Sequence, residues 1–175
     1  NGDCAHPKLA SSITVPNSHG HMGGWADDGK TYYIGQQFRG LGGILPIIDV
    51  TDPYNAKWLL NWTFTGDGRP HDVSTNKDGT RLYAAQPGNF GAPANDSSFG
   101  PDGLVILDVS DIQSRRPNPQ IRIVSKLFWD DQGQAEQMLP FFSHGRSYLI
   151  STDESGGQAG VGRLAAACAR GASPY

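Results

Sequence analysis

The stretch that decides the fold is RPHDVSTNKDGTRLYAAQ, residues 69–86, followed by GLVILDVSDI, residues 103–112. Each part has an earlier copy in the chain. The first part is repeated by HMGGWADDGKTYYIG, residues 21–35, and the second by LPIIDVTDP, residues 45–53. Because both copies keep their order, the sequence predicts repeated structural units.

The first step of this repeat spans 50 residues. His21 and His71 each stand seven positions before an Asp-Gly pair, and they are 50 residues apart. Asp-Gly after a short strand predicts a hairpin turn, because glycine accepts the positive φ that such turns need. Two large apolar residues four positions apart follow each aliphatic segment. These pairs are Trp58 with Trp62 and Ile123 with Leu127, and Leu9 with Ile13 has the same spacing near the start of the chain.

The repeat divides the chain into units. One complete unit covers residues 17–64, a second covers 68–129, and 135–175 start a further unit with two strands within 135–153. Residues 7–15 are expected to form the outer strand of a preceding unit. The strands expected in the first unit are residues 20–26, 31–36, 44–50 and 57–64.

Four-stranded antiparallel units of this length, set side by side, are typical of a β-propeller. The predicted fold class is therefore all-β: a β-propeller of four-stranded blades, of which this chain holds about half. Two blades are complete, and partial blades stand at both ends. Since closed propellers usually have roughly 4 to 8 blades, we expect the remainder of the propeller in the same chain or in another.

Composition excludes several classes of protein. The chain has 175 residues, 37% of them hydrophobic, and no apolar run approaches the roughly 18 residues that a membrane-spanning helix needs. A net charge of −3 with scattered signs gives no basic stripe, which argues against nucleic-acid binding. Cys4 and Cys168 are either bridged, as in an oxidising compartment, or two separate small apolar side chains.

Histidines at repeated positions are the main candidates for a site. His19 and His21 are two positions apart, so on a strand both imidazoles leave the same face. His71 takes the place of His21 in the next unit, and the first strand of each blade lines the channel of a propeller. Three imidazoles there would suit copper, zinc or iron. The competing interpretation is that each histidine bonds a neighbouring backbone carbonyl and seals the junction between two blades.

The third unit adds polar residues to this prediction. Aligning Gly145 with Gly29 and Gly79 puts Gln137 at the place of His21 and His71. Further candidate contributors to a metal site are Glu136, Gln137, His144, Asp153 and Glu154. Ser143 beside His144 does not indicate a hydrolase, because neighbours in sequence do not make a triad and no G-x-S-x-G turn is present.

Two groups of residues have other expected roles. The insertion at 86–103 is a candidate ligand-binding loop, because loops on rigid scaffolds often carry recognition. Its candidate contact residues are Asn89, Phe90, Asn95, Asp96 and Phe99. The aromatic residues that recur with the strands are expected in the cores instead. They are Tyr33, Trp58, Trp62 and Tyr83.

GLVILDVSD, with its second copy ILPIIDVTD, resembles the LVIVD repeat of predicted bacterial extracellular β-propellers, and the HDV and DGTRLY segments fit the same family. The resemblance covers residues 7–153 and implies a secreted or cell-envelope location. More distantly, the arrangement is similar to the selenium-binding protein and methanethiol oxidase propellers, whose channel histidines hold copper.

Three functions agree with these patterns. The first is a secreted or cell-envelope propeller that binds a protein, a glycan or a small molecule. The second is a metal-dependent oxidoreductase with His19, His21 and His71 in its channel. The third is a structural repeat segment of a larger assembly. Whether the protein is an enzyme is left open by the sequence.

Overall fold

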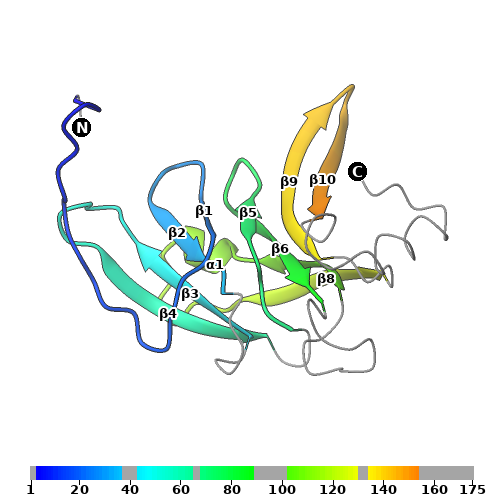
Figure 1. Cartoon of the computed structure of the whole chain (residues 1–175), viewed down its shortest axis with the longest axis horizontal. Coiled ribbons are helices and arrows are strands. Elements are labelled where there is room, and N and C mark those ends of the chain that lie inside the picture. The colour runs from blue at the N-terminus through cyan, green and yellow to red at the C-terminus, as the bar shows by residue number, and fades with distance from the viewer. Residues whose placement is uncertain (1–2, 37–42, 65–67, 89–101, 130–133, 154–175) are drawn as a thin grey trace, which may run out of the picture.

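The described part of the chain is an all-β protein. The structure, a computed structural model, describes residues 3–36, 43–64, 68–88, 102–129 and 134–153 (Figure 1). Within these ranges, ten strands form three antiparallel sheets, none of them closed, and one helical turn follows the seventh strand. The prediction of an all-β fold is confirmed. No helix in these ranges is long and apolar enough to cross a membrane.

The first sheet contains the four strands expected within residues 17–64. They are β1 (Gly23–Trp25), β2 (Thr31–Ile34), β3 (Gly43–Asp49) and β4 (Lys57–Phe64), hydrogen-bonded in that order. The β1–β2 turn follows the predicted Asp-Gly chemistry. Gly29 has a φ of 66°, and the Asp28 carboxylate accepts a bond from the amide of Lys30 at 2.9 Å.

The second sheet repeats the first. Its strands are β5 (Val73–Thr75), β6 (Arg81–Pro87), β7 (Asp102–Asp108) and β8 (Arg122–Trp129), again in chain order. Gly79 has a φ of 69°, and the Asp78 carboxylate accepts from the amide of Thr80 at 3.0 Å. The two Asp-Gly turns thus have the same conformation and lie 50 residues apart in the chain.

The third sheet is a hairpin of two strands, β9 (Ala135–Ser143) and β10 (Arg146–Asp153). His144 and Gly145 form its two-residue turn, with φ values of 48° and 76°. Two successive positive φ values define a type I′ turn, which suits the twist of a hairpin. The prediction of two strands within residues 135–153 is confirmed.

The prediction of a strand over residues 7–15 is wrong, because the structure has no strand there. Pro7 and Pro16 have no backbone N–H to donate to a ladder. The segment is held by side chains instead. The side-chain amide of Asn61 on β4 donates to the carbonyl of Pro16 at 2.9 Å, and the Ser11 hydroxyl donates to the carbonyl of Pro53 at 2.8 Å.

Two apolar cores join the three sheets. The larger core lies between the first two sheets and includes Tyr33, Leu45 and Leu82. The smaller core lies between the second sheet and the hairpin and includes Leu104 and Met138. Adjacent first strands also lie side by side, β1 beside β5 and β5 beside β9. Each sheet therefore buries one face against the next sheet in the chain.

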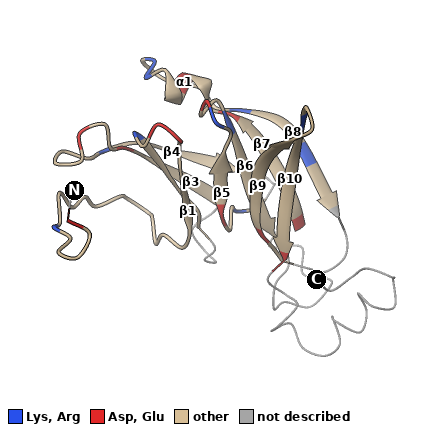
Figure 2. Ribbon diagram, turned by 90° about the horizontal axis from the view of Figure 1, so that it is seen from above, with Lys and Arg blue, Asp and Glu red and all other residues tan. Residues whose placement is uncertain are grey.

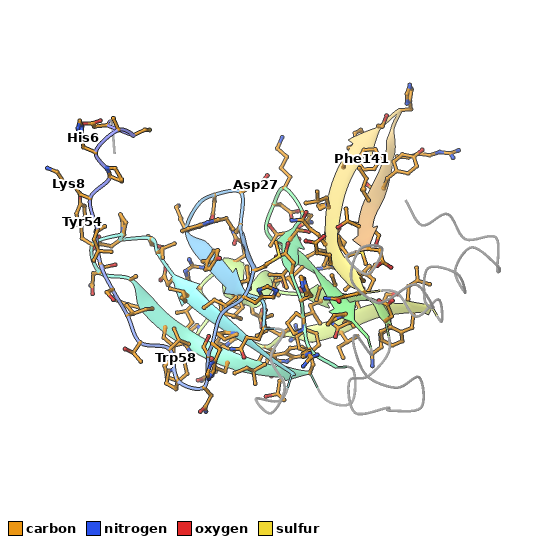
Figure 3. All side chains as sticks on the ribbon, in the orientation of Figure 1. His6, Lys8, Asp27, Tyr54, Trp58 and Phe141 are labelled. Atoms are coloured by element: carbon orange, nitrogen blue, oxygen red, sulfur yellow. The ribbon has the colours of Figure 1, made fainter. Side chains whose placement is uncertain are left out.

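Four aromatic residues were predicted to lie in the cores, and the prediction is confirmed for three of them. Tyr33 is buried, and Trp62 and Tyr83 pack against the two cores. Trp58 is the exception, because β4 has an extra residue, Leu59, at an irregularity in its pairing with β3, and this pairs Trp58 with Ile48 on the outer face of the first sheet. There its indole donates to the side chain of Asn61 at 3.0 Å, beside the N-terminal segment (Figure 3).

A single arginine ties the first two sheets together. The helical turn α1 (Ser110–Gln113) follows β7, and Arg115 comes two residues after its end. Its guanidinium donates to the Thr31 hydroxyl at 2.9 Å, the Lys30 carbonyl at 2.9 Å and the Asp49 carboxylate at 3.0 Å. All three acceptors belong to the first sheet or to its turn. Arg115 therefore acts as a clamp from the second sheet to the first.

Candidate functional site

The candidate site lies where β1, β5 and β9 come together. His21 and His71 each stand two residues before a first strand. Their amides make equivalent backbone bonds, from His21 to the carbonyl of Gly35 at 3.0 Å and from His71 to the carbonyl of Ala85 at 2.8 Å. The repeat thus fixes both histidines at the same level of neighbouring sheets.

Close contact between the sheets brings the two histidines together. A side chain on Gly24 would clash with the carbonyl of Val73, and a side chain on Gly35 would clash with the carbonyl of His71. Glycine at these two positions allows β5 to approach the backbone of the first sheet. The imidazoles can then meet across the junction.

The two imidazoles face each other edge to face. Their Nε2 atoms are 3.2 Å apart, and the ring centroids are 4.7 Å apart at an interplanar angle of 79°. His71 is buried, with 1% of its surface accessible, whereas His21 is exposed. The pair therefore has one protected ring and one ring that reaches solvent.

The hydrogen bond of Nδ1 defines the tautomer of His71. This nitrogen lies 3.2 Å from the backbone carbonyl of Glu136 on β9. A carbonyl only accepts, so Nδ1 carries the proton and, in the neutral ring, Nε2 presents a lone pair toward His21. The prediction that a repeated histidine bonds a neighbouring backbone carbonyl is confirmed for His71.

A buried carboxylate adjoins the histidine pair. Asp72 is 1% exposed, and its two oxygens accept from the amide of Val73 at 2.7 Å and from the side chain of Gln137 at 2.8 Å. Burial raises the pKa of Asp72, and these two bonds together with the nearby His71 and His21 offset part of that rise. The corresponding residue of the first sheet is Met22, so the first sheet has no counterpart of this carboxylate.

The histidine pair fits part of a metal site. In a tetrahedral site with metal–nitrogen bonds of about 2.0–2.1 Å, two imidazole nitrogens lie roughly 3.3 Å apart. The observed 3.2 Å between Nε2 atoms agrees with that spacing, and the Nδ1 bond to a carbonyl is the usual support of a ligating histidine. Among the described residues, however, no group of three His, Cys, Asp or Glu side chains could hold an ion. His19 does not complete such a group.

The other predicted metal ligands lie apart from the pair. Glu136 contributes its backbone carbonyl, while its carboxylate accepts from the Thr152 hydroxyl at 3.4 Å. His144 lies at the hairpin tip, where Nδ1 is 2.9 Å from the Ser143 hydroxyl. Asp153 pairs with Ala135 at the opposite end of the hairpin, so Ser143, His144 and Asp153 form no triad.

Several predicted residues lie outside the described ranges. They are Glu154, Cys168 and the loop residues Asn89, Phe90, Asn95, Asp96 and Phe99. The bridge between Cys4 and Cys168 and the ligand-binding role of the loop thus stay predictions. Cys4 itself is exposed.

The alignment of the third unit predicted from Gly145 is wrong by one residue. The hydroxyl of Ser74 donates to the carbonyl of Met138, and Gly24, which Ser74 matches in the repeat, faces the carbonyl of Val73. Met138 therefore corresponds to Val73, and Glu136 rather than Gln137 stands at the place of His71. The error arose because the third hairpin has a shorter turn and longer strands than the other two.

Sequence reasoning missed Asp72 as a member of the site. One signal was present, because an acidic residue follows His71 where the other copy has the apolar Met22. The backbone carbonyl of Glu136 had no such signal, because a main-chain acceptor is independent of side-chain type. Among the residues drawn in Figure 2 outside the grey trace, basic and acidic side chains elsewhere are scattered over turns and strands, with the two signs mixed.

The described part of the chain is thus an all-β structure with a histidine pair between two four-stranded sheets of the same strand order. Comparison of the chain with protein-family models and with curated proteins finds no match in either set.

Proposed function

We propose that this chain is a segment of a β-propeller that acts as a ligand-binding module, with the ligand bound at the junction of β1, β5 and β9. Two equivalent four-stranded sheets with adjacent first strands support the propeller arrangement. A secreted or cell-envelope location is part of the proposal and rests on the sequence resemblance alone.

The observation that carries the proposal is the exposed imidazole of His21 next to the buried, oriented imidazole of His71. A ligand that reaches His21 from solvent meets a ring whose Nε2 is already 3.2 Å from a second nitrogen. Two ring nitrogens held this close together, one of them on an exposed ring, can contact one polar group without a change in the backbone.

The test is a fragment screen read by NMR on the imidazole carbon signals of His21 and His71. We expect polar fragments to shift both signals together, and we expect the substitution His21→Ala to abolish the effect. His144→Ala at the hairpin tip is the matched control and should change nothing. A screen in which no fragment moves either signal would contradict binding at this junction.

A second candidate function is a metal-dependent oxidoreductase, favoured by the spacing of the two Nε2 atoms. His21 and His71 would hold the ion, and the carbonyl of Glu136 would fix the orientation of His71. A bound transition metal would supply Lewis-acid or redox chemistry, while the residues of this chain bind and orient it.

Native mass spectrometry with added Zn²⁺ or Cu²⁺ separates the two candidates. One ion per chain, lost in both His21→Gln and His71→Gln but kept in His144→Gln, would support the metal site. Protein that stays metal-free while fragments still shift the imidazole signals would leave the binding module and remove the oxidoreductase.

A further inference from the structure

Strand β10 differs from its counterparts in the other two sheets because it lies at an edge. Among the described residues the third sheet has only β9 and β10, whereas β2 lies between β1 and β3, and β6 lies between β5 and β7. The side of β10 that faces away from β9 is thus the side on which β2 and β6 each bind a third strand.

The hairpin geometry identifies the backbone groups on that side. In a two-residue hairpin the residues that flank the turn, here Ser143 and Arg146, exchange both hydrogen bonds. Alternation along β10 then directs the N–H and C=O groups of Ser147, Leu149 and Ser151 away from β9.

The second sheet supports this assignment. The backbone of Ala85 bonds to Asp72 and His71 on the β5 side, so Ala84 faces β7 and pairs with Val105. Val73 pairs with Ala84, and Met138, the counterpart of Val73 in the third sheet, pairs with Ser151. Ser151 therefore corresponds to the residue that binds the third strand in the second sheet.

An exposed apolar side chain of the second sheet indicates the same position for a third strand. Trp62 on β4 lies opposite Leu45 on β3 and packs against the core between the first two sheets. Its counterpart, Leu127 on β8, lies opposite Leu104 on β7, yet Leu127 is 60% exposed. The smaller core includes Leu104 but not Leu127. The two strands of the hairpin are too few to cover the full width of the four-stranded second sheet.

We propose that the edge of β10 binds an additional antiparallel strand from a separate polypeptide segment, with branched aliphatic side chains at successive positions as in β3 and β7. The character of the added strand follows from the two equivalent pairings in this chain, since β3 (GILPIID) pairs with β2 and β7 (DGLVILD) pairs with β6. Main-chain bonds to Ser147, Leu149 and Ser151 give the affinity, and apolar side chains extend the core toward Leu127. This interaction surface is independent of the histidine junction.

The experiment uses the whole 175-residue chain and a synthetic peptide with the sequence of residues 102–111, DGLVILDVSD. We expect saturable binding that slows amide exchange at Ser147, Leu149 and Ser151. Tyr148 and Ile150 should not change, because their amides already face β9. Protection of both sets, or of neither, would overturn the proposal.

A pair of matched variants tests the edge. Ser151→Pro removes an outward N–H, and proline is tolerated on edge strands, so peptide affinity should fall by about tenfold or more. Ser151→Ala keeps the N–H and should bind the peptide like the original chain. Equal affinity for the two variants would place the peptide elsewhere.

A second pair of peptides avoids any change to the protein. In the second sheet the amide of Val109 donates to Thr80 beside β6, so by alternation Val105 and Leu107 also face β6. Peptides methylated on the Val105 and Leu107 nitrogens should lose binding, whereas methylation on Leu104 and Ile106 should spare it. Binding that is insensitive to both would contradict strand addition.

Discussion

At the scale of single residues, two carboxylates close to β5 lie in opposite electrostatic environments. Asp72 is buried beside a histidine pair, and burial raises its pKa even though Val73 and Gln137 donate to its oxygens. Asp78, at an exposed turn, has its pKa lowered by the hydroxyl and amide of Thr80. The two carboxylates should therefore affect stability with opposite signs.

The pH dependence of unfolding should show these signs. The protonated Asp72 favours the folded state, so its contribution is complete below pH 3.8 and is lost as the pH rises through its higher folded pKa. Asp72→Asn should therefore become progressively more stable than the original chain between acidic and neutral pH, as measured by urea unfolding.

Asp78→Asn is the control for that measurement. Its pKa is lowered in the folded state, so the carboxylate stabilises the protein above pH 3.8, and this contribution disappears as the pH falls through the folded pKa. The asparagine variant should be less stable at neutral pH and equal to the original chain in strong acid. The same sign of change in both variants would contradict the assignment.

Gly35 should be among the least replaceable residues at the junction. An added Cβ would lie 2.3 Å from the carbonyl of His71, so Gly35→Ala should cost about 1–3 kcal/mol by forcing the sheets apart. Gly29→Ala is the matched control, because it meets no atom within 4 Å and costs only about 1 kcal/mol of left-handed strain. Thermal unfolding measures both, and only Gly35→Ala should also shift the imidazole signal of His71.

At the scale of elements, the helical turn α1 does more than connect β7 to β8. Gln113 at its end donates to the Asp28 carboxylate at 2.7 Å, and Arg115 bonds three groups of the first sheet. The pKa of Asp49 is lowered against the effect of burial, by bonds from Thr51 and Arg115. The loop between β7 and β8 of the second sheet thus fixes turns of the first sheet.

Replacing Arg115 should loosen this contact. Arg115→Ala removes a planar group that bonds three acceptors and should lower the free energy of unfolding by about 2–4 kcal/mol. Arg115→Lys keeps the charge but not the fork, and should lose about half as much. Arg116→Ala is the control, since Arg116 makes only a surface contact with Asp111 at 3.4 Å. Urea unfolding that ranks Arg116→Ala with Arg115→Ala would refute the role of the clamp.

Much of the element order could be predicted from the sequence, because Asp-Gly turns and aliphatic strands repeat at fixed spacing. The limits have physical causes. Residues 7–15 alternate like a strand, but prolines and side-chain bonds replace a ladder. The third unit lacks an Asp-Gly turn, so the position of Glu136 required the contacts between sheets. The His21–His71 pair was expected, while the buried Asp72 depended on a packing that no spacing reveals.

At the scale of the whole molecule, the two ends of the described fold are unequal. The outer face of the first sheet is partly covered by the N-terminal segment, which bonds to Asn61. The face of the hairpin that is turned away from the second sheet instead exposes four large apolar side chains. They are Leu139, Phe141, Tyr148 and Ile150, of which Phe141 is labelled in Figure 3. The hairpin end should therefore dominate self-association.

Two substitutions on equivalent strands test how the molecule covers its apolar surface. Leu127→Ser should change stability by less than about 0.5 kcal/mol, because the side chain is 60% exposed, and should reduce light scattering at high protein concentration. Trp62→Ser should cost about 3–5 kcal/mol, because Trp62 packs against the main core. Similar losses at both positions would show that Leu127 is already covered.

The Arg115 clamp also governs how the molecule opens in time. Because the Arg115 clamp and a shared core join the first two sheets, their amides should exchange with solvent in a single cooperative event close to global unfolding. The β9–β10 hairpin shares only the smaller core and should open by itself at lower free energy. His71 would then lose its Glu136 carbonyl transiently while His21 stays in place, so the tautomer of the pair would fluctuate with the hairpin.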